Sequence, residues 1–146
     1  MKKIVLSIFT LSCLFLTGCN NSNQDTISQP NGKIILDEKE YLMIQNDFKW
    51  KENDIEINDV SSRGLDALAE EFETLIVEKG EILSFEIENT PTTIDVTQYN
   101  EDQSNHVIEM KEEQIIMPTE EGYYIYEINV TWENGMGTYV FDVDVN

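Results

Sequence analysis

Cysteine is nearly absent from this chain. Its 146 residues include two, Cys13 and Cys19, and both belong to the first nineteen positions. The rest of the chain can therefore form no disulfide, no thiolate metal site and no cysteine nucleophile. A domain built from it must be stabilised by packing alone.

Histidine is almost as scarce, because His106 is the only one. It falls in the polar segment NEDQSNH, residues 100–106, which predicts a loop, and a lone loop histidine is more often solvent-exposed than catalytic. No G-x-S-x-G elbow, Walker loop, G-x-G-x-x-G or H-E-x-x-H motif accompanies it. Carboxylates are plentiful, but a paired-acid hydrolase needs two of them at a defined separation, which a sequence does not reveal. We therefore expect no enzymatic activity.

Basic residues are few. Nine Lys and Arg stand against 29 Asp and Glu, which gives a formal charge of −20. Nucleic acid binding needs clustered Lys and Arg, so this class of partner is excluded. Direct association with anionic lipid is disfavoured for the same reason. The charge is compatible with a cation or a basic peptide as ligand, and equally with a role in solubility alone.

The N-terminal segment has the composition of an export signal. Lys2 and Lys3 precede an apolar run over residues 4–16, and such a run is shorter than the roughly 20 residues that a spanning helix needs. The segment ends in Leu16-Thr17-Gly18-Cys19, which resembles the bacterial lipobox. This resemblance implies cleavage before Cys19 and a diacylglyceryl group on its sulfur. Two acyl chains anchor a protein stably where one is marginal.

Three regions follow from this interpretation. Residues 1–18 form the lipoprotein signal peptide, residues 19–31 the lipidated N-terminus and a flexible polar tether, and residues 32–146 one domain. Removal of the signal leaves 7 basic against 29 acidic residues, a charge of −22. We expect a protein held by lipid at the extracytoplasmic face of the cell membrane.

Apolar residues alternate with polar ones through most of the domain. Such a period of two predicts half-buried β-strands. Leu65, Leu68, Ala69 and Phe72 break the alternation at helical spacing and predict one short helix, at about 65–73. Seven to nine short strands separated by regular turns predict a mainly β fold, an antiparallel β-sandwich.

Residues 120–126, EEGYYIY, identify the kind of sandwich. Glu120, Gly122 and Tyr124 have the spacing of the tyrosine corner of immunoglobulin-like domains, and Tyr126 occupies the position of the disulfide cysteine. The domain resembles an immunoglobulin-like β-sandwich without its disulfide. This resemblance implies that the Tyr124 hydroxyl bonds to the backbone of a neighbouring loop. Signal and composition together resemble small acidic surface lipoproteins of AT-rich Gram-positive bacteria, a likeness that implies no activity.

Calcium is the cation that the acidic residues would suit, because hard cations take carboxylate and carbonyl oxygens. Asn100, Glu101 and Asp102 lie in the predicted loop and form the candidate site. Two strand faces offer further oxygens: Asp54, Glu56 and Asn58 on one, and Asp142, Asp144 and Asn146 on the other. Alternating acids are also typical of the solvated face of a strand, so both interpretations stay open.

The sequence therefore predicts a lipid-anchored, non-enzymatic binding or interaction module with no cofactor, whose partner is an envelope protein. The alternative is a calcium-binding or cation-stabilised surface domain.

Overall fold

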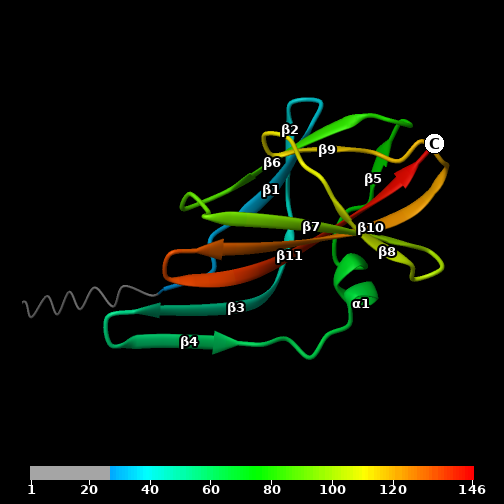
Figure 1. The fold of residues 1–146 in the computed structure, drawn as a ribbon. Helices are drawn as coiled ribbons and strands as arrows, with labels where there is room; N and C mark the ends of the chain where they lie inside the picture. The colour runs from blue at the N-terminus through cyan, green and yellow to red at the C-terminus, as the bar shows by residue number, and fades with distance from the viewer. Residues whose placement is uncertain (1–26) are drawn as a thin grey trace, which may run out of the picture.

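The alternating pattern forms eleven strands and one helix within residues 27–146, the part of the chain that the computed structural model describes (Figure 1). The predicted signal peptide, Cys19 and most of the predicted tether lie outside the described residues. The helix within residues 27–146 lacks the length and apolar character needed to cross a membrane. The elements are β1 Gly32–Leu36, β2 Lys39–Leu42, β3 Ile44–Glu52, β4 Ile55–Asp59, α1 Leu65–Ala69, β5 Leu75–Val77, β6 Ile82–Ile87, β7 Thr93–Asn100, β8 Asn105–Ile108, β9 Gln114–Ile116, β10 Gly122–Trp132 and β11 Gly135–Val145.

The strands form two sheets that pack face to face. The smaller sheet has the order β2-β1-β6-β9, and the larger has the order β4-β3-β11-β10-β7-β8, with β5 beside β11. All pairings are antiparallel except that of β5 with β11. The predicted β-sandwich is confirmed.

The strand order is that of an immunoglobulin-like sandwich. Strands β1, β6 and β9 take the places of A, B and E, while β7, β10 and β11 take those of C, F and G. Two strands share the place of the first strand, one in each sheet: β1 pairs with β6, and β5 pairs in parallel with β11. Residues 37–74 between these two halves are an insertion that carries β2, β3, β4 and α1.

The helix of this insertion is shorter than predicted and lies outside the sandwich. It ends at Ala69 rather than near residue 73, and a turn follows in which the Phe72 amide donates to the Ala69 carbonyl at 2.9 Å. Leu68 and Ala69 pack on Ile125 and Val140, on the outer face of the larger sheet. Phe72 instead reaches the main core. The segment therefore passes β11, between the parts that pair with β3 and with β5, from the outer face to the interior.

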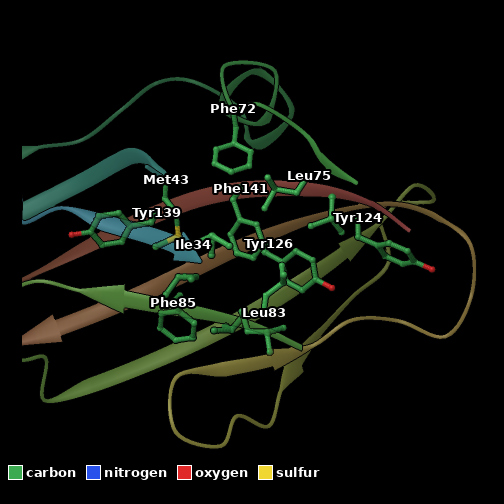
Figure 2. Packing of buried hydrophobic residues seen from close by; sticks show 14 of the residues in the cluster. Ile34, Met43, Phe72, Leu75, Leu83, Phe85, Tyr124, Tyr126, Tyr139 and Phe141 are labelled. Atoms are coloured by element: carbon green, nitrogen blue, oxygen red, sulfur yellow. The ribbon is translucent and has the colours of Figure 1, made fainter. Parts of the chain in front are cut away.

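The main core is aromatic where the two sheets meet (Figure 2). Tyr126 is fully buried and stacks on Phe141 with ring centroids 4.8 Å apart and planes at 8°. Its hydroxyl donates to Oε1 of the buried Gln98 at 3.1 Å. A stacked ring pair with a satisfied hydroxyl thus fills the position that corresponds, by the sequence resemblance, to the disulfide of immunoglobulin-like domains.

The two ends of the sandwich differ (Figure 1). The near end is where the described chain begins: Gln29 donates to the Thr138 carbonyl at 3.1 Å, and Tyr139 donates to the Pro30 carbonyl. The far end carries the β7–β8 turn, residues 101–104, and the β9–β10 connection, residues 117–121. Gly122 lies at the far end of β10, and Val130 lies toward the near end, where it pairs with Gly137. At roughly 3.3 Å per residue, this stretch of β10 separates the two ends by about 26 Å.

Candidate functional site: an acidic groove at the far end

The residues of the predicted tyrosine corner lie together at the start of β10. Tyr124 Oη donates to the carbonyl oxygen of Glu120 at 3.0 Å. Gly122 lies between them with φ +150°, a backbone conformation that favours glycine. Burial is the main cause that raises the pKa of the Tyr124 hydroxyl, and the charges of Glu120 and Glu101 add to it. This bond holds the β9–β10 connection against the end of β10.

The predicted calcium ligands lie in the neighbouring β7–β8 turn. Asn100 ends β7, and its side-chain amide donates to Ser104 Oγ at 2.7 Å. Asp102 Oδ1 accepts the Ser104 amide at 2.9 Å as well as its hydroxyl, and these bonds hold the pKa of Asp102 below its usual value. One oxygen of the predicted calcium ligands, Asp102 Oδ1, is thus already engaged in hydrogen bonds within the turn.

The described residues do not gather three or more acidic or histidine side chains that could hold a metal ion. Asp54 lies in the β3–β4 turn, while Glu56 and Asn58 lie on β4. On the other predicted face, Asp142 is 1% exposed and Asp144 only half-buried. The expectation of a solvated face is wrong for Asp142, because α1 covers that part of the larger sheet.

A groove of about 790 Å³ opens at the far end between the edge strands β8 and β9. Its apolar lining comes from both sheets, and two of these residues are unusually exposed: Val107 on β8 at 68% and Ile116 on β9 at 65%. The apolar residues are Val107, Ile108, Ile116, Met117, Pro118 and Tyr124. Edge strands also carry backbone groups on their outer side that can pair with a further strand.

Carboxylates surround this lining. They belong to Glu101, Asp102, Glu109, Glu120 and Glu121. No Lys or Arg lines the groove, and among ion pairs of the described residues only that of Glu121 with Lys79, at 2.7 Å, involves one of these five acids. Lys79 lowers the pKa of Glu121 through this contact. The groove therefore presents apolar surface inside a rim of carboxylates, of which all but Glu121 have no ion pair within residues 27–146.

His106 also lines the groove, but it belongs to strand β8 and not to the predicted loop. The turn is shorter than expected because Asn105 already pairs with Tyr99. The imidazole is exposed, and within residues 27–146 no hydrogen bond joins it to a hydroxyl that could act as a nucleophile. The arrangement is suited to binding.

The sequence alone offered little indication of this groove, because the groove forms only when the fold brings two edge strands together. Val107 and Ile116 occupy ordinary strand positions, and only the strand order exposes both beside one opening. The chain matches no protein-family model, and no curated protein is similar to it.

Proposed function

We propose that this protein is a lipid-anchored, non-enzymatic interaction module that binds a positively charged protein segment in the groove at its far end. The observation that carries the proposal is the apolar lining between β8 and β9 within a rim of five carboxylates. An apolar patch rimmed by polar groups is typical of a binding surface.

The position of the groove fits a protein anchored through its N-terminus. A lipid on Cys19 would attach the chain on the side of the near end, where Gln29 and Pro30 contact β11. The groove lies about 26 Å farther along β10. The near end would thus face the membrane, and the groove would face the space beyond it.

The shape and charge of the groove favour an extended basic segment. Strand β8 is paired on one side only, with β7, so a further strand can add to its outer edge. Alternate side chains of an added strand point to opposite faces. Apolar side chains on one face of such a segment would contact the apolar lining of the groove, and its basic side chains would reach the carboxylate rim. An envelope protein with a segment of this kind is the partner that we propose.

The test is a binding titration on the full chain in maltoside micelles. The probe is a labelled eight-residue peptide of alternating lysine and valine, followed by fluorescence anisotropy. We expect saturable binding of this peptide. A lysine–serine peptide of equal charge should bind at least about tenfold more weakly, because it lacks the apolar contacts. A glutamate–valine peptide should not bind.

Two pairs of variants locate the site. Glu109→Lys with Glu120→Lys should abolish binding of the lysine–valine peptide. Asp54→Lys with Glu133→Lys makes the same change in charge at turns of the near end and should leave most of the affinity. Equal losses in both pairs would reduce the interaction to general charge attraction and contradict the groove.

A further inference from the structure

A second cavity lies on the other side of Tyr123, over the outer face of the larger sheet. Its volume is about 570 Å³, within the range of small-molecule sites, and it is more enclosed than the groove. We call it the outer pocket. It is lined by Leu65, Asp66, Tyr99, Asn100, Glu101, Gln103, Tyr123 and Ile125.

Three elements of the fold, β7, β10 and α1, build the outer pocket. Ile125 of β10 forms its buried floor, and Tyr99 lies directly beside it on β7. Tyr123 lies two residues before Ile125 on the same face of β10. Leu65, at the start of α1, packs against the same cluster as both tyrosines and closes one side. Both aromatic side chains are only partly buried, so part of each borders the cavity.

The polar groups of the pocket are negative or neutral. Asp66 and Glu101 supply two carboxylates, while Asn100 and Gln103 supply amides. No Lys or Arg belongs to the lining, and no ion pair within residues 27–146 involves Asp66 or Glu101. Burial, followed by the charges of Asp142, Asp66 and Glu70, raises the pKa of the Tyr123 hydroxyl. Negative potential thus extends into the pocket.

Two tyrosines, an aliphatic floor and uncompensated carboxylates form a combination that suits one class of ligand. An organic cation carries its charge within apolar substituents, so it gains from contact with aromatic and aliphatic carbon and from nearby carboxylates at once. An anion would meet repulsion, and a metal ion would find too few convergent carboxylates. We propose that the outer pocket binds a small organic cation, with Tyr99, Tyr123 and Ile125 against its apolar part and Asp66 and Glu101 balancing its charge. The outer pocket shares Asn100, Glu101 and Tyr123 with the groove, but this proposal concerns a different ligand and does not rest on peptide binding.

The test compares two probes of the same shape. Choline carries a quaternary nitrogen, and 3,3-dimethylbutan-1-ol has a neutral carbon in its place. Each is titrated into the full chain in maltoside micelles, and binding is followed by NMR shifts of backbone amides. We expect saturable shifts at residues 65–66, 99–103 and 123–125, with choline about tenfold tighter than the alcohol.

Variants test whether the carboxylates and the tyrosine rings of the outer pocket contribute to choline binding. Asp66→Asn with Glu101→Gln should weaken choline binding about tenfold. Glu109→Gln with Glu120→Gln removes the same charge from residues that line only the groove, and should leave choline affinity unchanged. Tyr99→Leu keeps apolar volume but removes a ring, and should also weaken binding. Amide spectra of each variant show whether the fold is retained.

Three outcomes would overturn the proposal: shifts that do not saturate, equal affinity for choline and the neutral alcohol, or equal losses in the two charge variants. The groove proposal is tested with a different ligand, and substitution of Glu109 and Glu120 should weaken peptide binding but not choline binding, so either proposal can fail alone.

Discussion

Thr74 donates a hydrogen bond from Oγ1 to Oδ2 of Asp142 across 2.7 Å, beneath the layer formed by α1. Asp142 is 1% exposed, and its other carboxylate oxygen has no hydrogen-bond partner among the described residues. Burial raises the pKa of Asp142, against the opposing effects of the bond from Thr74 and of the nearby Tyr123 hydroxyl. Because removal of water penalises the charged form, a single buried carboxylate lowers stability at neutral pH.

The substitution Asp142→Asn should raise the melting temperature at neutral pH. The folded-state pKa is raised, so the folded protein binds this proton more tightly than the unfolded chain, and its stability falls as pH rises through that pKa. The advantage of the variant should therefore shrink as pH falls toward the ordinary aspartate range. Thermal melts across pH, with the half-buried Asp144→Asn as the charge-matched control, measure this difference. A gain that is equal in both variants would point to relief of overall charge repulsion instead.

Loss of the corner hydroxyl in Tyr124→Phe should destabilise the domain by about 1 kcal/mol, because the Glu120 carbonyl loses its donor. Urea denaturation measures the change. The partly buried Tyr41 makes no hydrogen bond through its hydroxyl within the described residues, so Tyr41→Phe is a matched control that should change little. Unaltered stability in Tyr124→Phe would mean that water replaces the bond without cost.

Calcium and magnesium should raise the melting temperature of the full chain equally at matched ionic strength. Screening of a large negative charge relieves repulsion in the compact state whichever ion supplies it. A melt series with each chloride salt tests this expectation. A larger rise with calcium that disappears in Asp102→Asn would instead support a calcium site at Asn100, Glu101 and Asp102.

Replacement of Cys19 by serine should prevent lipid attachment and leave the fold unchanged. Cys19 lies outside the described residues, so this prediction depends on the lipobox resemblance alone. Mass spectrometry should find a diacylglyceryl group and the absence of residues 1–18 in the membrane fraction of the parent protein. In Cys19→Ser, the chain should keep its signal or leave the membrane. A variant that still carries lipid would contradict the assignment.

Local sequence patterns predicted the long strands well, although residues 27–146 form eleven strands where seven to nine were predicted. Apolar alternation in residues 122–132 and 135–145 corresponds to β10 and β11, and Asn134-Gly135 lies at their turn. A Cβ on Gly135 would come within 2.2 Å of the Lys49 carbonyl oxygen, so this position favours glycine. The Tyr124–Glu120 corner bond was also predictable, because its spacing involves residues close together in the chain. Alternation within one segment is enough to assign such features.

Features that depend on distant segments were not predictable. Asp142 has the pattern of a solvent-facing strand residue, yet a helix about seventy positions earlier covers it. The helix itself ends early because Phe72, which completes the helical pattern, packs on Phe141 in the main core at a ring separation of 6.1 Å. The groove and the outer pocket likewise require strand order, which alternation does not encode.

The place of β11 within the larger sheet has a consequence for the order in which the protein can form. This strand pairs with β3, β5 and β10, so β5 has no partner strand, and β3 has only β4, until residues 135–145 are available. During synthesis from the N-terminus, the larger sheet therefore stays incomplete until almost the whole chain has been made. A nascent chain with this topology cannot complete its larger sheet for most of its synthesis, and an unfolded polypeptide is the form that can be threaded across a membrane.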